Sequence, residues 1–152
     1  MKTKKIFLMM PFLFLIMGIG GCEDKNEIFP DATIVKELPK VNVIGNSTKS
    51  IIIQSQRELE AVFSKNELQQ VNDLQQIDFS KYTLLLGYGT YPNEVSNMEH
   101  SFSKTGTNTY TYLLKITGDA TRPEAFRYGI LVGKLPKSAK VIFKIEELYL
   151  EN

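Results

Sequence analysis

Residues 97–116, NMEHSFSKTGTNTYTYLLKI, carry the pattern that decides the fold. Apolar side chains recur at every second position on both sides of a short polar segment that contains a glycine. One face of the first half holds Met98, His100 and Phe102, and one face of the second half holds Tyr110, Tyr112, Leu114 and Ile116. A period of two predicts half-buried strands, and the polar residues 104–108 predict a turn between them. The stretch therefore predicts a β-hairpin.

Three segments around this hairpin also predict strands. Residues 82–89, YTLLLGYG, form the apolar run of a buried strand. Residues 125–133, AFRYGILVG, and 139–150, AKVIFKIEELYL, alternate between apolar and polar positions. The alternation slips at Glu146 and Glu147, which predicts a bulge or the exit of the strand from the sheet.

The segment before residue 82 predicts short strands and one helical stretch. Residues 33–38 and 41–46 are β-prone runs separated by Pro39, and three isoleucines mark a clearer strand over 49–55. Ser-x-x-Glu patterns, typical of the helix-starting capping box, begin at residues 55 and 64. Apolar residues at helical spacing follow, so we expect one short or broken helix over about residues 56–70.

These elements together predict a single α+β domain over residues 32–152. One helical segment and six or more strands in hairpin order favour a mainly antiparallel β-sheet or an open barrel. We expect the helix to cover one face or one end of the sheet. A chain of 152 residues is long enough for one such domain.

The composition excludes several classes of function. The 18 Lys and Arg residues nearly balance the 17 Asp and Glu residues, which argues against a nucleic-acid partner because such proteins need a basic face. One cysteine and one histidine are too few for most zinc centres, which use three or four ligands of these types or carboxylates. We therefore expect no metal site and no cofactor.

The N-terminus carries a targeting pattern. Three lysines within the first five residues precede the apolar residues 6–19, IFLMMPFLFLIMGI. This run is shorter than the roughly 20 residues that span a bilayer as a helix. A positive start, a short apolar run and small residues after it predict a secretory signal peptide over residues 1–21.

The junction after this run, Ile19-Gly20-Gly21-Cys22, resembles the lipobox of bacterial lipoproteins. The resemblance implies that the peptide before Cys22 is removed and that Cys22 becomes a palmitate-bearing N-terminus, anchored in membrane lipid. Residues 22–31 are then the lipidated cysteine and a flexible acidic tether, similar to the surface-export signals of Bacteroidetes lipoproteins. We expect a location in the bacterial cell envelope, at the outer membrane.

Two segments could carry chemistry. The stretch SFSKTG, 101–106, contains the Ser-x-x-Lys and Lys-Thr-Gly patterns of serine β-lactamases, but the two overlap on a predicted strand. Ser101 and Lys104 then point to opposite sides, so we expect no catalytic site. The lone histidine, His100, has apolar partners on its face and is interpreted as a semi-buried residue rather than as a catalytic base.

The segment after the strand at 82–89 is the candidate partner-binding loop. Tyr91, Pro92 and Asn93 form a turn signal behind a strand broken by glycines. One interpretation is a kinked strand and a structural turn. The other is a partner-facing loop with Tyr88 and Tyr91 exposed, because tyrosine offers rigid apolar area and a hydroxyl group to an interface.

Three segments resemble the C-terminal domain of the protease-complex-subunit (PrcB-like) family. They are IIIQSQRELEAVF at 51–63, IDFSKYTLLLGYG at 77–89 and KVIFKIEEL at 140–148. Members often carry a Gly-Gly-Tyr loop where this chain has residues 90–93, TYPN. The resemblance implies a small, mainly β, envelope-associated module that supports a partner protein and has no catalytic residues.

We therefore expect a non-enzymatic lipoprotein module that binds an envelope or surface protein, such as a protease complex. The alternative is a surface lipoprotein that binds a carbohydrate or small ligand through its tyrosines. Those tyrosines are Tyr88, Tyr91, Tyr110 and Tyr112. A small hydrolase built on His100 is the third hypothesis.

Overall fold

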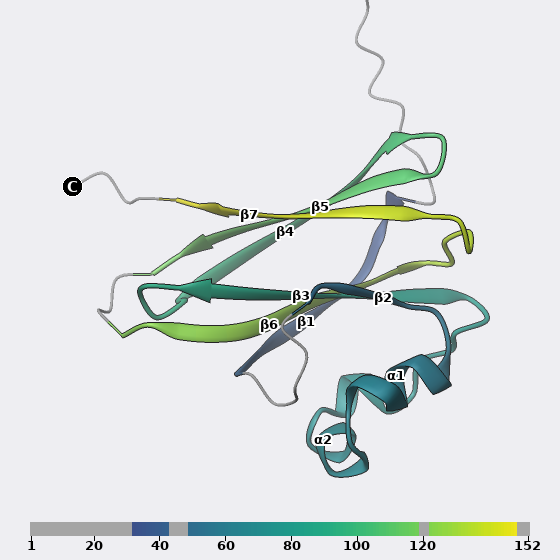
Figure 1. The fold of residues 1–152 in the computed structure, drawn as a ribbon, viewed down its shortest axis with the longest axis horizontal. Coiled ribbons are helices and arrows are strands. Elements are labelled where there is room, and N and C mark those ends of the chain that lie inside the picture. The colour runs from purple at the N-terminus through teal and green to yellow at the C-terminus, as the bar shows by residue number, and fades with distance from the viewer. Residues whose placement is uncertain (1–31, 43–48, 119–121, 149–152) are drawn as a thin grey trace, which may run out of the picture.

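The computed structural model describes residues 32–42, 49–118 and 122–148, which form two sheets and a helical layer (Figure 1). The four-stranded sheet has the order β1-β6-β3-β2, and the three-stranded sheet has the order β4-β5-β7. The strands are β1 (Ile34–Asn42), β2 (Ile51–Ile53), β3 (Tyr82–Tyr91), β4 (Asn97–Gly106), β5 (Thr109–Thr117), β6 (Glu124–Gly133) and β7 (Lys140–Glu147). The helical layer consists of α1 (Gln56–Val62), α2 (Lys65–Gln70) and a 3₁₀ turn, η2 (Asn72–Leu74). The predicted α+β class, mainly β, is confirmed, and the sheets do not close into a barrel.

Two apolar clusters hold the three layers together. The inter-sheet cluster fills the space between the two sheets and includes Tyr110, Tyr112, Phe126, Tyr128 and Ile130. The helix-side cluster lies between the four-stranded sheet and the helices and includes Ile53, Leu59, Phe63, Leu84 and Leu86. The helices therefore cover the outer face of the four-stranded sheet, as the sequence predicts (Figure 1).

Strand β3 explains why residues 82–89 are almost continuously apolar. It lies between β6 and β2 in the four-stranded sheet. Leu85 belongs to the inter-sheet cluster, whereas Leu84 and Leu86 belong to the helix-side cluster. Because both faces of the strand are covered, neither requires polar residues.

The hairpin of β4 and β5 is confirmed, with a tighter turn than predicted. The apolar face of β5 is fully buried along its length, at 0–1 % exposure. β4 continues to Gly106, which pairs with Thr109, so that only residues 107 and 108 lie between the two strands. A register shift between Lys104 and Gly106 marks a bulge at the end of β4.

Two predictions about the strands are wrong. Pro39 does not separate two strands but lies inside β1, which is tolerated because β1 is an edge strand with a bulge at that position. β7 pairs with β5 in parallel, so the hairpin order does not extend to the last described strand. The slip at Glu146 and Glu147 is not a bulge, because the register continues to Glu147; it marks the end of the strand.

The helical stretch forms as two short helices, one of the two predicted arrangements. The Ser64 side chain accepts a hydrogen bond from the Glu67 N–H while the Glu67 side chain accepts from the Ser64 N–H, which completes a capping box. Ser55 caps α1 in the same way, but Glu58 accepts from the Gln54 N–H instead. Among the described residues no helix has the length and apolar character needed to cross a membrane.

Candidate functional site

The candidate site begins with a bulge in β1. Leu38 pairs with Gly129 and Val41 pairs with Arg127, so Pro39 and Lys40 together face the single residue Tyr128 of β6. An extra residue of this kind re-aims the side chains that follow it. As a result Lys40 reaches the end of the sandwich, where it contacts β6 and the link between β3 and β4.

Lys40 ties β1 to β6 through an ion pair, and it also bonds the link between β3 and β4. Its Nζ donates hydrogen bonds to Glu124 Oε1 at 2.7 Å and Oε2 at 3.0 Å, and to the carbonyl oxygen of Val95 at 3.1 Å. The Val95 N–H in turn donates to Glu124 Oε1 at 2.9 Å. Burial raises the pKa of the Glu124 carboxyl, but the hydrogen bonds from Lys40 and Val95 outweigh it, so the pKa is lowered overall. The Glu124 carboxyl is therefore ionised at neutral pH.

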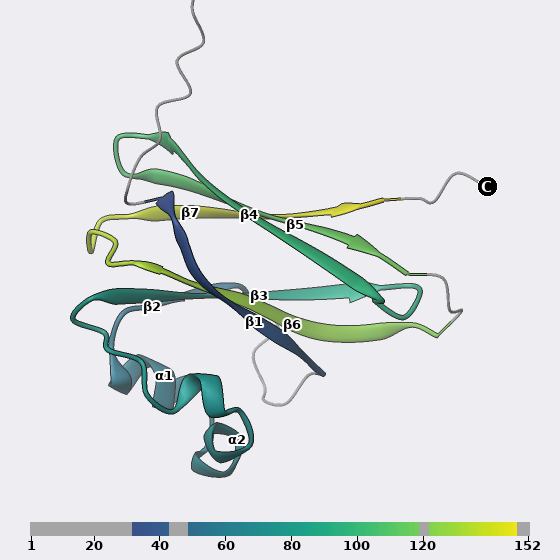
Figure 2. The same cartoon turned by 180° about the vertical axis from the view of Figure 1, so that it is seen from behind.

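A cleft opens beside this ion pair, between β1 and β4. It has a volume of about 250 Å³. Its walls are formed by Glu37, Leu38 and Lys40 from β1, by Val95 and Ser96 from the link, and by Asn97, Met98 and His100 from β4. β1 and β4 are the edge strands of their sheets and lie on the same side of the molecule, the near side in Figure 2.

His100 forms one wall of the cleft and is held by Tyr112. Its Nδ1 lies 2.7 Å from the Tyr112 hydroxyl oxygen, and the two rings stack with centroids 5.9 Å apart. Burial lowers the pKa of His100, an effect that Glu37 opposes, so the ring is neutral at pH 7. The expectation of a semi-buried histidine is confirmed, and its Nδ1 has a hydrogen-bond partner.

The candidate partner-binding loop differs from its prediction. Tyr91 is the last residue of β3, is 4 % exposed and belongs to the inter-sheet cluster. Tyr88 also lies within β3 and is half-buried, so the interpretation with two exposed tyrosines is wrong. The reason is that β3 continues past Gly87 and Gly89 without breaking.

The remaining loop residues, Pro92 and Asn93, follow the strand as a bend. Pro92 lies with Tyr91 beside a shallow depression that Pro123 and Ala125 also border. Nothing in this geometry orients a side chain for recognition, and the interpretation as a structural turn describes it best.

Three of the four tyrosines considered for ligand binding are buried in the core. Tyr91, Tyr110 and Tyr112 are at most 4 % exposed and pack between the sheets. A sugar ring needs an accessible aromatic face, and these rings offer none. The observation that motivated a carbohydrate-binding role is therefore removed for three of the four tyrosines.

The Ser-x-x-Lys residues of β4 have different surroundings. Ser101 is exposed on one side of β4, whereas Lys104 lies over the Tyr110 ring at 5.8 Å from its centroid. Residues 32–42, 49–118 and 122–148 contain no group of three His, Cys, Asp or Glu side chains suited to a metal ion. The lipobox residues Ile19, Gly20, Gly21 and Cys22, the signal peptide and the tether lie outside the described residues.

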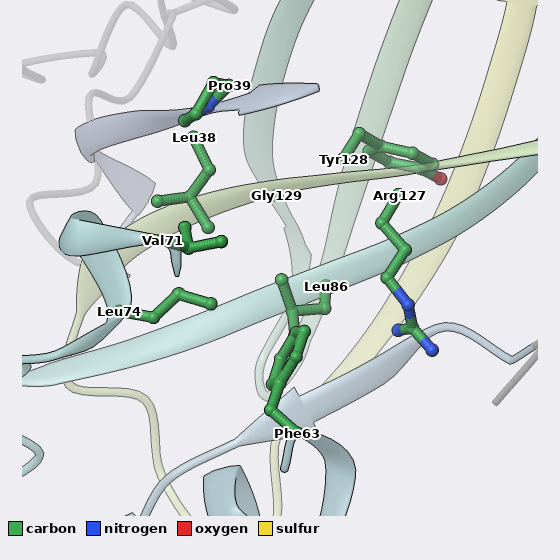
Figure 3. Close-up of a pocket in the computed structure, with 9 residues that line it drawn as sticks. All are labelled: Leu38, Pro39, Phe63, Val71, Leu74, Leu86, Arg127, Tyr128 and Gly129. Atoms are coloured by element: carbon green, nitrogen blue, oxygen red, sulfur yellow. The ribbon is translucent and has the colours of Figure 1, made fainter. Parts of the chain in front are cut away.

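Arg127 is a buried residue that the sequence analysis did not identify. It is 2 % exposed, and its guanidinium lies 5.7 Å from the centroid of the Phe63 ring. It borders a pocket between β6 and the helices that is otherwise lined by apolar side chains such as Leu38, Val71 and Leu74 (Figure 3). The free volume is about 10 Å³, at most that of one water molecule, so this pocket is a packing gap.

Comparison of the chain with protein-family models, with curated proteins and with solved structures gives no match. The PrcB-like resemblance therefore stays a prediction from the sequence.

Proposed function

We propose that the chain is a non-enzymatic, lipid-anchored module of the bacterial envelope that binds an extended segment of a partner protein in the cleft between β1 and β4. The observation that carries this proposal is the cleft itself, bordered by two edge strands. In the described topology β1 pairs only with β6 and β4 only with β5. An edge strand has unpaired backbone N–H and C=O groups, which an extended peptide can pair with.

A binding role is also supported by the ionisable groups around the cleft. Lys40 and Glu124 are bonded to each other, and the Nδ1 of His100 is taken by Tyr112. A general base needs a partner that orients it and a nucleophile within hydrogen-bond distance. The described groups are arranged as supports of the cleft walls, which favours recognition over catalysis.

The lipobox supports the envelope location. Lipidation of Cys22 would hold the domain at the membrane, because two or more acyl chains anchor a protein stably. The predicted tether, residues 23–31, spans at most about 30 Å when extended. A module on so short a tether meets partners close to the bilayer, which favours another envelope protein as the partner.

Affinity purification from native membranes tests the proposal. We expect the lipidated wild-type protein to recover one partner protein in stoichiometric amount. Asn97→Trp should abolish that recovery, because Asn97 is exposed and lines the cleft, so a bulky ring blocks it without disturbing the core. Ser101→Trp is the matched control, an exposed position of β4 that does not line the cleft, and should retain the partner.

Two outcomes would count against this function. One is repeated purification of the wild-type protein without a stoichiometric partner. The other is equal recovery by Asn97→Trp and wild type, which would place the partner on another surface.

A further inference from the structure

We infer that the cleft between β1 and β4 takes a lysine or arginine side chain of the extended partner segment, with its cationic group against Glu37. This inference rests on the proposed function and adds the chemistry of the residue that is recognised. It is carried by the charges of the cleft walls, by the side chains between those charges and by the volume of the cleft.

Glu37 gives the cleft its net charge. The charge of Lys40, a second wall residue, is balanced by Glu124, to which Lys40 donates two hydrogen bonds of 2.7 and 3.0 Å. His100 is the remaining titratable wall residue and is neutral. In the part of the chain that the structure describes, no hydrogen bond or ion pair engages the Glu37 carboxylate. One unbalanced carboxylate, exposed at the wall of the cleft, favours a cation.

The direction of Glu37 follows from the strand register. Glu37 pairs with Ile130, whose side chain belongs to the inter-sheet cluster. The next residue, Leu38, belongs to the helix-side cluster, so neighbouring side chains of β1 alternate between the two faces. Glu37 therefore points toward the second sheet, where it lines the cleft opposite His100.

The cleft walls match the two parts of a long basic side chain. Met98, whose side chain is half-buried, is an apolar wall residue of the cleft, and Leu38 and Val95 complete the lining beside Glu37. Lysine and arginine bury their methylene stems along apolar surface and keep the charged end at a polar group. A volume of about 250 Å³ is below that of typical sites for drug-sized ligands, and it is suited to one side chain.

His100 offers a donor for the backbone of the same segment. Burial raises the pKa of the Tyr112 hydroxyl far above its ordinary value, so this group keeps its proton and can donate it to Nδ1. The ring hydrogen of the neutral imidazole then lies on Nε2. An Nε2–H at the wall of the cleft suits a peptide carbonyl oxygen, which an extended segment presents at every second residue on each edge.

Peptide binding to the purified protein in detergent tests this inference. The probes are acetylated and amidated five-residue peptides, Thr-Val-Xaa-Val-Thr, with lysine, arginine, norleucine or glutamate at Xaa. We expect the lysine and arginine peptides to bind about tenfold more tightly than the norleucine peptide, the effect of one charge-assisted contact. Glu37→Gln should remove this preference. Glu99→Gln is the matched control, because Glu99 is exposed on β4 and does not line the cleft.

Three results would overturn the inference. They are equal binding of the lysine and norleucine peptides, an unchanged preference in Glu37→Gln, and binding of free putrescine or glucosamine as tight as that of the lysine peptide. The last result would show that the site binds a cationic group alone and does not form backbone hydrogen bonds with an extended segment.

The inference and the proposed function can fail separately. If Glu37→Gln still recovers the partner from membranes and Asn97→Trp does not, the inference is wrong and the function stands. If the lysine peptide binds as expected while no partner protein is recovered, the function is wrong and the chemistry of the cleft stands.

Discussion

At the residue scale, Gly87 of β3 leaves room for the ring of Tyr128 on the neighbouring strand β6. The two residues pair directly, and a Cβ atom on Gly87 would lie 2.0 Å from Cζ of Tyr128. The tyrosine ring cannot move aside easily, because it is 2 % exposed and packs against the rings of Tyr112 and Phe126. Its burial also raises the pKa of the Tyr128 hydroxyl to about 12. Glycine is therefore required at this position by packing.

Gly87→Ala is expected to lower the free energy of unfolding by about 1–3 kcal/mol, the usual cost of overpacking a dense core. Urea denaturation followed by circular dichroism measures the change. Gly133→Ala is the control, because a Cβ atom on Gly133 would meet nothing within 4 Å. The control should be neutral or slightly stabilising, since alanine restricts the unfolded chain. Equal destabilisation by both variants would contradict this account.

At the element scale, the bulge in β1 couples an edge strand to the end of the sandwich. The side chains of the Lys40–Glu124 pair are 24 % and 15 % exposed, so the pair is largely shielded from solvent. It also holds the link that leads into β4 through both backbone groups of Val95. The ion pair, which lies within the four-stranded sheet, therefore ties β1 and β6 to the link that leads into β4.

The lowered pKa of Glu124 predicts a loss of stability in acid. The pKa of Glu124 in the folded state lies below its unfolded-state value of about 4.3. The ionised carboxylate therefore stabilises the folded state fully above pH 4.3. This stabilisation is lost as the pH falls through the folded-state pKa. We expect Glu124→Gln to be about 1–3 kcal/mol less stable at pH 7, with the difference shrinking on acidification. Thermal unfolding from pH 7 to pH 3 measures both; a constant difference would argue against the ion pair as the cause.

The elements differ in how well the sequence predicts them. The faces of β4 and β5 follow from local alternation, which depends only on which side of a strand is covered. β1 continues through Pro39 because it forms a bulge against β6. The local sequence around Pro39 does not indicate which distant strand will pair with it. The same holds for the parallel pairing of β7 with β5, because β6 separates these two strands in the sequence and belongs to the other sheet.

The candidate cleft was less predictable than the sheets for the same reason. His100 was placed correctly because its own face of β4 is apolar. Glu37 and Lys40 were not identified, because an acidic and a basic residue in a short β-prone run read as ordinary exposed positions. The two glycines before Tyr91 permit the interpretation of an exposed loop, yet those glycines lie within the paired part of β3.

At the scale of the whole molecule, the predicted lipid anchor determines where the cleft acts. We expect Cys22→Ser to leave the protein unlabelled by palmitate, with its signal peptide uncleaved, because only the thiol accepts the lipid. Metabolic labelling and membrane fractionation measure this. Asp24→Asn, two residues further along the tether, is the control and should keep the label. A Cys22→Ser protein that stays membrane-bound and labelled would overturn the prediction of a lipoprotein.

The pairing of β1 with β6 has a consequence for the order in which the chain folds. Ile34 pairs with Val132, and β5 receives its parallel partner only from β7, which begins at Lys140. A nascent chain that has emerged only as far as β5 therefore holds neither sheet complete, and such long-range pairing is slow to form. The topology delays folding until nearly the whole described chain has been synthesised. A polypeptide that stays unfolded for that long can pass through a translocation pore as an extended chain.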